Sequence, residues 1–334
     1  MNRLFDSLEP AWRSPHYVSI DEDALLFVAT DIADADFCIP AWRDEVFPEG
    51  DDDIFVEFIG VQHAIQFCFI DEATGQKFDA EYPRGSGKVW RGSYAMTACL
   101  KRALDEGVPI LDPGFLGALT IEQVRKLFEP VNTPIPLLEE RLACLSSVGW
   151  KLCLGKYKSF SQLFSASKFL LFNNGEGIVD QLLNDFWAYQ DAHMWRGEHQ
   201  LQFAKRAQLL PMIYHGRALA SNGALPLIVD PEHFGPVCDY VVPNALRKLG
   251  VLRYVPSLHQ KILEGKTLPQ WSDEEIEIRA LTARAVKLLL DEVNIHRRKG
   301  GKEPILIPHL DSYLWSNGRQ ESEFLHHKTY TIAY

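Results

Sequence analysis

The 334-residue chain has no apolar run approaching the roughly 18 residues that a transmembrane helix requires. Its opening residues, MNRLFDSLEPAWRSP, lack the apolar segment of a signal peptide. Its six cysteines form no CxxC pair and no group with the spacing of metal ligands. The lack of a long apolar run predicts that the chain has no transmembrane helix. Together these absences predict a cytoplasmic protein with reduced, mostly buried thiols and with neither a metal nor a redox cofactor.

Basic residues are scarce, and one stretch almost lacks them. The chain has 34 Lys and Arg against 45 Asp and Glu, which gives a formal net charge of −11. Between Asp21 and Glu57 there are 13 acids and a single base, Arg43, so the rest of the chain is close to neutral. Proteins that bind nucleic acids neutralise phosphates with many Lys and Arg side chains. The sequence therefore predicts no direct nucleic-acid partner, whereas a small nucleotide needs only a few cations.

The spacing of apolar residues predicts a mainly α protein with a small N-terminal antiparallel β-sheet, an α+β fold. The sequence QFCFI at 66–70 alternates and is followed by the turn pair Thr74-Gly75, so 66–70 and 77–82 are expected to form a hairpin. We expect residues 1–20 to be irregular and 304–315 to form a strand followed by a short helix. The expected helices are 21–35, 54–65, 94–106, 120–128, 137–154, 159–166, 177–185, 198–213, 239–250, 257–264 and 272–296.

The chain is long enough for one large domain or two closely packed ones. The predicted division places the N-terminal helices and the hairpin in residues 1–92. Residues 93–334 then form a helical domain that packs against them as one unit. The sequence does not indicate the oligomeric state.

The stretch from Val237 to Gly250 has the features of a short helix with an acid at its start. Pro243 suits the first turn of a helix, and Gly250 is a natural stop. Asp239 lies at or just before the helix N-terminus, where the helix dipole favours a negative charge. Two interpretations remain open, because Asp239 is either only a helix cap or also an ionised carboxylate with a chemical role.

Around Asp239 the pattern Asp, a β-branched residue three positions later and then LRKLG resembles helix-hairpin-helix DNA glycosylases. A longer resemblance, from about residue 21 to 334, is to the queuosine salvage protein family. The runs that carry it are YAMTACLKRALDEGVPILDPGFLGALT (94–120), PLLEERLACLSSVG (136–149), FAKRAQLL (203–210), the stretch 239–250, EIEIR (275–279) and DSYLW (311–315). The resemblance implies a hydrolase that releases queuine from queuosine 5′-phosphate, with a helical body similar to helix-hairpin-helix glycosylases.

Hydrolysis of an N-glycosidic bond requires a carboxylate near the sugar, an oriented water molecule and a way to accommodate the departing base. The resemblance makes Asp239 the catalytic carboxylate. It places Asp311 at the edge of the base, where a carboxylate can accept two N–H bonds, unless Asp311 is only a cap or a surface charge. Tyr313 alternates with Asp311, as Trp315 does, and either stacks on the base or belongs to the core.

Lys205 and Arg206 are the candidates for binding the 5′-phosphate, with solvated charge or an internal ion pair as the alternative. For Arg279 the structural interpretation is favoured. Tyr240, Val237 and His63 complete the proposed substrate-binding set, although an isolated histidine is more often structural. The pair His326-His327 is expected at the surface, and no metal-binding residues are predicted.

Several positions depart from the family pattern. His63 and Gln66 stand in HAIQF where the family commonly has Asp-x-Leu-Asn-Phe. The other departures are Val237 for an aromatic residue, Val241 for Arg, Ile213 for Asp and Ser316 for Asp. These changes leave the base that is released open. The predicted function is a cofactor-free N-glycosidase for queuosine 5′-phosphate or a related 7-deazapurine nucleotide. The alternatives are a non-catalytic binder of a base or nucleotide, a glycosylase for a different nucleotide and a nucleic-acid glycosylase, the last disfavoured by the charge.

Overall fold

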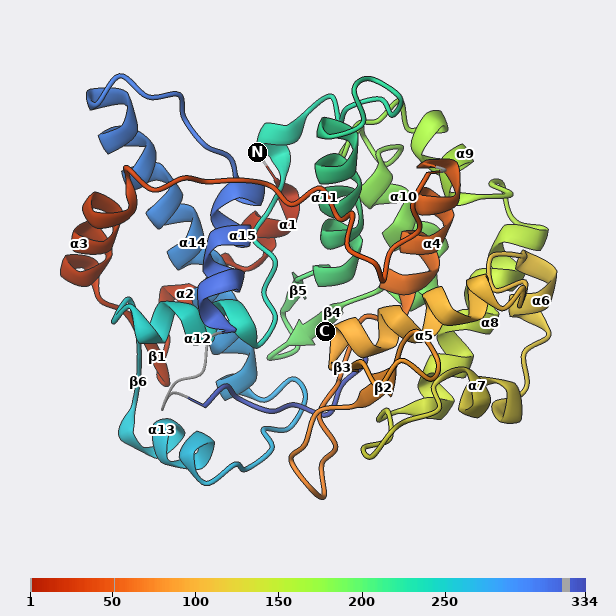
Figure 1. The fold of residues 1–334 in the computed structure, drawn as a ribbon. Coiled ribbons are helices and arrows are strands. Elements are labelled where there is room, and N and C mark those ends of the chain that lie inside the picture. Colours follow the sequence, from red (N-terminus) through yellow and green to blue (C-terminus); the bar gives the residue numbers. More distant parts are fainter. Residues whose placement is uncertain (1, 51, 320–324) are drawn as a thin grey trace.

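The computed structural model describes residues 2–50, 52–319 and 325–334, and it is mainly helical as predicted (Figure 1). No helix in these residues is both long and apolar enough to cross a membrane. The α-helices of the described residues are α1 Arg3–Ser7, α2 Glu9–Arg13, α3 Glu22–Ile32, α4 Asp52–Ala64, α5 Ser93–Asp105, α6 Pro113–Gly117, α7 Ile121–Leu127, α8 Leu138–Leu154, α9 Phe160–Ala166, α10 Ile178–Asp185, α11 Lys205–Leu219, α12 Val241–Lys248, α13 Pro256–Leu263, α14 Asp273–Lys299 and α15 Ile307–Gly318. Single turns of 3₁₀ helix follow at η1 Trp187–Tyr189 and η2 Pro231–His233.

Polar side chains cap the N-termini of several helices, close to the starting positions that the sequence predicts. Asp21 accepts a hydrogen bond from the backbone N–H of Ala24 at the start of α3, at 2.9 Å. Thr120 and Gln123 form the reciprocal capping box expected at the start of α7. Ser272 caps α14, the longest of the described helices. The helices predicted to start at these residues are confirmed. Each cap satisfies backbone N–H groups that the first turn leaves without partners, which explains why the helix begins there.

The strands form three separate antiparallel pairs in the described residues. β2 (Asp79–Glu81) pairs with β3 (Val89–Arg91), and β4 (Ala192–Trp195) pairs with β5 (His199–Gln202). β1 (Val18–Ile20) pairs with β6 (Leu252–Tyr254), so strands far apart in the sequence meet. The small antiparallel sheet near the N-terminus is thus present as β2–β3, and two further pairs lie elsewhere.

The predicted hairpin of 66–70 with 77–82 is confirmed only in part, because the chain reverses direction here without a regular strand at 66–69. These segments share a single bridge, between Ile70 and Lys77, and 66–69 is not a strand. The buried side chain of Arg141 explains the difference, because it donates to the carbonyl oxygens of Ile65, Phe67 and Cys68 at 2.5, 2.6 and 2.7 Å. An arginine therefore satisfies the acceptors that a β-ladder would otherwise use.

Arg141 should be essential for stability. Its side chain is fully buried, and this burial lowers its pKa to about 9. Replacing it with Leu would leave several buried carbonyl groups without donors, each at a cost of about 1–3 kcal/mol. We expect Arg141→Leu to lower the free energy of unfolding by at least about 3 kcal/mol, measured by urea denaturation. An unchanged denaturation midpoint would contradict this account of the 65–69 segment.

Three other expectations fail at particular residues. The segment 1–20 was expected to be irregular, but its described part, 2–20, contains α1, α2 and β1. The helix expected over 198–213 begins only at Lys205, because the preceding residues form β5 after a turn at Gly197. The C-terminal segment 304–315 contains no strand, and Pro308 instead lies in the first turn of α15.

One buried hydrophobic cluster contains residues from both 1–92 and 93–334. α14 packs against α3, α2, α12 and α15, while α11 packs against α4. Figure 1 shows α11 near the middle of the molecule, with α15 on one side and α4 on the other. The division into two segments stays a prediction, as does the likeness to helix-hairpin-helix glycosylases. The helices α4, α11, α12 and α15 together bring the candidate site residues to one place.

Candidate active site

A cavity lies among α4, α5, α11, α12 and α15, and helical spacing explains which side chains reach it. On α11 the lining residues Lys205, Leu209 and Met212 are four and seven positions apart. On α15 Asp311 and Trp315 line it four positions apart. Residues at these intervals share one face of a helix, so α11 and α15 each present one face to the cavity.

Asp239 lines this cavity from the turn that leads into α12. One of its oxygens, Oδ1, accepts hydrogen bonds from the backbone N–H groups of Val241 and Val242 at 2.7 and 3.1 Å. The residue is only 9% exposed. The two interpretations of Asp239 are therefore compatible in geometry, since one oxygen caps the helix while the carboxylate still lines the cavity.

Asp311 lines the same cavity from α15 and is 8% exposed. Its Oδ1 is buried without a hydrogen-bond partner among the described residues. Burial, followed by the negative charge of Asp239, raises the pKa of Asp311 to about 8, and Lys205 opposes that rise. Near neutral pH Asp311 is thus mainly a carboxylic acid with a hydroxyl group to donate.

Lys205 is buried beside these two acids, at the first position of α11. Burial lowers the pKa of Lys205, while the charges of Asp239, Asp311 and Asp191 raise it. The backbone N–H of Lys205 donates to Asp191, and Asp191 forms a fully buried ion pair with Arg279 at 2.6 Å. Arg279 therefore has the structural role that its sequence context favours, because it anchors the start of the helix that carries Lys205.

Arg206 does not line this cavity. It is fully buried, donates to the carbonyl oxygen of Ala64 and lies 5.1 Å from the centre of the Phe67 ring. One residue along an α-helix turns the side chain by about 100°, so Lys205 and Arg206 cannot share a face. The structure brings Lys205 to the cavity and directs Arg206 into the core.

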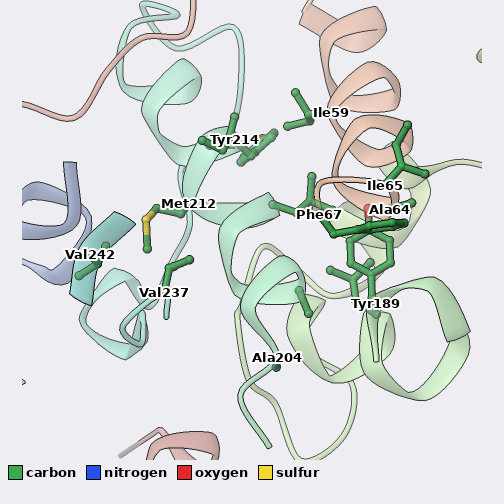
Figure 2. Close-up of a cluster of buried hydrophobic side chains, with 14 of the residues drawn as sticks. Ile59, Ala64, Ile65, Phe67, Tyr189, Ala204, Met212, Tyr214, Val237 and Val242 are labelled. Atoms are coloured by element: carbon green, nitrogen blue, oxygen red, sulfur yellow. The ribbon is translucent and has the colours of Figure 1, made fainter. Parts of the chain in front are cut away.

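Figure 2 shows the hydrophobic surroundings of this arrangement. Met212, Val237 and Val242 lie on one side of the view, whereas Ala64, Phe67 and Tyr189 lie on the other. Met212, Val237 and Val242 also line the cavity, so one part of its wall is apolar.

Tyr313 is also absent from the cavity wall. Its ring packs on Phe37 at a centroid distance of 5.2 Å. Asp311, Tyr313 and Trp315 would share a face only in a strand, where the side-chain period is two residues. Because this segment is helical, Asp311 and Trp315 face the cavity together and Tyr313 does not.

His63 lines the cavity from the last turn of α4, although only 2% of the residue is exposed. Its Nδ1 is 2.8 Å from the carbonyl oxygen of Ile59, so Nδ1 carries the proton and Nε2 is an acceptor. Burial lowers the pKa of His63 to about 3, and the charges of Lys205 and Arg206 act in the same direction. His63 is therefore neutral at physiological pH.

Other lining residues carry buried polar atoms without a hydrogen-bond partner among the described residues. They are Nε1 of Trp42, Oε1 of Gln62 and Oε1 of Gln66. A buried polar atom without a partner costs about 1–3 kcal/mol, so such atoms mark places where a ligand can bind. Sequence reasoning did not select Trp42 or Gln62 as ligand residues, since a loop tryptophan and a helix glutamine carry no local signal of their position.

Tyr240 also lines the cavity, and its ring lies 4.7 Å from that of His326. The expectation that His326-His327 lies at the surface is wrong for His327, which is 2% exposed and lies 3.2 Å from the hydroxyl of Tyr334. Of the departures from the family pattern, Ser316 alone does not line the cavity. Those that do are His63, Gln66, Ile213, Val237 and Val241.

No group of three or more His, Cys, Asp or Glu in the described residues is arranged to hold a metal ion. The four buried cysteines, Cys68, Cys99, Cys144 and Cys238, are unpaired thiols. The cavity instead contains two carboxyl groups, a lysine whose charge interacts with both of them, and a neutral histidine. This set supports proton transfer and stabilisation of a positive charge.

Known proteins resemble this chain over most of its length. The family described as "Queuosine salvage protein" matches residues 46–334. A curated relative from Sphaerobacter thermophilus, named queuosine 5′-phosphate N-glycosylase/hydrolase, is 32% identical over 335 residues, covering 99% of this chain and 95% of its own. Relatives of the same name from Bos taurus and Mus musculus are each 28% identical, covering 85% and 89% of this chain and 82% and 87% of their own. The chain therefore belongs to the queuosine salvage protein family.

Proposed function

We propose that this chain is an N-glycosidase that hydrolyses queuosine 5′-phosphate, or a related 7-deazapurine nucleotide, and releases the free base. The observation that carries the proposal is the pairing of Asp239 with Asp311 in one cavity, where their environments differ. Two nearby carboxyl groups in different protonation states can divide the roles of base and acid. The names of the curated relatives support the same reaction.

Asp239 acts on the sugar. As the bond between the anomeric carbon and the glycosidic nitrogen breaks, positive charge develops on the ribose. An ionised Asp239 stabilises that charge. It also orients a water molecule and accepts one of its protons while the water oxygen bonds to the anomeric carbon. The hydrogen bonds to Oδ1 from Val241 and Val242 hold the carboxylate in place during this step.

Asp311 acts on the base. Its hydroxyl group donates the proton that the leaving base requires, so Asp311 ends the reaction ionised. Asp239 ends it protonated, because it has accepted a proton from the attacking water. Asp239 then gives a proton to solvent and Asp311 takes one from solvent, which restores both groups. The overall reaction consumes one water molecule. Lys205 compensates the negative charge of the pair throughout, because its ammonium group is buried beside both acids.

This assignment predicts the alkaline limb of the pH profile. Since kcat/KM reports ionisations of the free enzyme, it should fall above about pH 8 as Asp311 loses its proton. The variant Asp311→Asn keeps a donor of similar shape but has no proton to give. We expect it to turn over more slowly and to lack this limb. Base release measured between pH 5 and 10 checks both points, and a parent limb near pH 8 that persists in the variant would reassign it to another group.

The same group should affect stability. The pKa of Asp311 is raised from 3.8 to about 8 in the folded chain, so the protonated form is favoured by folding. Its contribution is complete below pH 4 and is lost as the pH rises through about 8. The ligand-free parent should therefore lose more stability between pH 6 and 9 than Asp311→Asn does. This comparison is made by denaturation at each pH.

The function itself is tested by incubating the chain with queuosine 5′-phosphate and with other purine and 7-deazapurine nucleotides, and by detecting free base by mass spectrometry. Release of no base from any of them would refute the proposal. Binding without release would instead support a non-catalytic nucleotide-binding protein. Because His63, Gln66, Ile213 and Val241 depart from the family pattern at the cavity wall, we propose weaker discrimination among 7-deazapurine nucleotides than its relatives show.

A further inference from the structure

Three cationic side chains line the cavity and form no ion pair with a described residue, although Arg91 lies opposite Asp79 in the β2–β3 pair and interacts with its charge. The three are Lys77, Arg91 and Arg319, and all three residues are also exposed to solvent. None forms an ion pair with any residue that the structure describes, whereas many other surface cations of this acidic chain do. Their charges therefore remain available to a ligand that enters the cavity.

These three residues come from separate segments but converge on the start of α5. Lys77 precedes β2, and Arg91 ends β3, which pairs with β2. The side chain of Lys77 passes beside Gly92, since its Cδ atom lies 3.8 Å from where a Cβ atom on that glycine would be. The guanidinium carbon of Arg319 lies 5.1 Å from the ring of Tyr94 and 4.4 Å from that of Trp315. Gly92 and Tyr94 flank Ser93, the first residue of α5.

The charges crowd one another as this geometry implies. The pKa of Lys77 is lowered first by the partial burial of its ammonium group and then by the positive charges of Arg319 and Arg91. Like charges that approach each other without a counter-ion raise the free energy of the empty site. An anion placed among them would relieve that repulsion.

The start of α5 adds backbone donors to the same place. Gly92 is the N-cap of this 13-residue helix, has a φ of +61° and offers no side chain to cap it. Gly92, Ser93 and Tyr94 all line the cavity. The N–H groups in the first turn of a helix have no partner within the helix, and together with the helix dipole they favour a bound anion.

An unpartnered buried side chain beside this helix also indicates a ligand. Gln62 is 4% exposed, and its Nε2 donates to Oγ1 of Thr97 at 2.7 Å. Thr97 in turn donates to the carbonyl oxygen of Ser93. The Oε1 atom of Gln62 is buried without a partner among the described residues, and Gln62 is one of the residues that line the cavity. Because this oxygen is an acceptor, it calls for a ligand with a hydrogen-bond donor, such as a ribose hydroxyl group next to the phosphate, near the first turn of α5.

We propose that Lys77, Arg91 and Arg319, together with the first turn of α5, bind the phosphate monoester of the substrate. This inference rests on the proposed function and assigns a site for the 5′-phosphate of the nucleotide. It replaces the expectation for Lys205 and Arg206. Arg206 does not line the cavity. The charge of Lys205 interacts with those of Asp239 and Asp311, and these two acids would repel a phosphate bound beside them.

Three cations and one helix start suit a single phosphate group. A phosphate monoester carries close to two negative charges at neutral pH and has three terminal oxygens. Arginine can bind two of these oxygens at once, which a lysine cannot. The site therefore selects a nucleoside monophosphate over the free nucleoside, and it offers no extended row of cations for a polymer.

The test measures binding of ribose 5-phosphate, ribose and inorganic phosphate to the full chain by calorimetry. Arg91→Ala and Arg319→Ala should each weaken ribose 5-phosphate binding about ten- to a hundred-fold, since each removes a charge-assisted contact. Arg298→Ala is the matched control, because Arg298 is exposed in the last turn of α14 and does not line the cavity. It should leave binding unchanged. Melting temperatures verify that each variant is folded.

Loss of ribose 5-phosphate binding in Arg91→Ala and Arg319→Ala but not in Arg298→Ala supports the site, even if the chain releases no base from any nucleotide. Unchanged binding in both Arg91→Ala and Arg319→Ala overturns the site, even if the chain is an active N-glycosidase. With an active enzyme, kcat/KM for the nucleotide should fall in Arg91→Ala while that for the nucleoside stays the same. An equal fall for both substrates would contradict a phosphate-binding role.

Discussion

Replacement of Asp239 by Asn should lower turnover about a hundred- to a thousand-fold while the protein stays folded. Asn keeps the Oδ1 atom that accepts hydrogen bonds from Val241 and Val242, so the start of α12 is still capped. It removes the negative charge that stabilises the cationic sugar. Loss of such a preorganised electrostatic interaction costs about 3–4 kcal/mol in the transition state. Ligand affinity should change little, because the interaction is made mainly in the transition state.

The measurement is single-turnover release of base, compared with ligand affinity and melting temperature for the same variant. Asp112→Asn is a suitable control because Asp112 also caps a helix, α6, through a bond of 2.7 Å to the N–H of Phe115, and it is exposed away from the cavity. If capping alone mattered, both variants would behave alike. Base release at the parent rate by Asp239→Asn would remove Asp239 from the mechanism and leave Asp311 as the next candidate.

Local sequence was sufficient for features that depend on local interactions. Thr120 and Gln123 predict the start of α7, because the capping box that they form lies within four residues of sequence. The spacing around Pro243 and Gly250 predicts the helix after Asp239, and α12 is found at Val241–Lys248. Asp311 was selected as a ligand residue by family resemblance, and the structure brings it into the same cavity as Asp239.

Features that depend on distant residues were not predictable in this way. The strand expected at 66–70 has the correct alternation, but Arg141, more than 70 residues later, donates to the carbonyl groups of Phe67 and Cys68. Tyr313 was placed with Asp311 by a strand-like period that the helical backbone does not have. Lys77, Arg91 and Arg319 are isolated in the sequence and become a cluster only when the chain folds.

Replacement of Lys205 by Met should reduce hydrolysis of the nucleotide and of the free nucleoside to a similar degree, by about a hundred-fold. Lys205 is the buried cation whose charge interacts with Asp239 and Asp311. Without it, two buried carboxyl groups would repel each other with no compensating charge, and ionisation of either would be harder. The pKa of Asp311 should rise further, because the charge of Lys205 lowers it in the parent.

The comparison of two substrates makes this experiment decisive. If Lys205 held the 5′-phosphate, Lys205→Met would slow the nucleotide alone, because the nucleoside has no phosphate to lose. If Lys205 serves the acid pair, both substrates slow together and the alkaline limb of the pH profile moves to higher pH. Lys205→Arg keeps the positive charge and should restore part of the rate, although its planar head group fits the lysine position imperfectly. Unchanged hydrolysis of the nucleoside by Lys205→Met would show that the acid pair works without this cation.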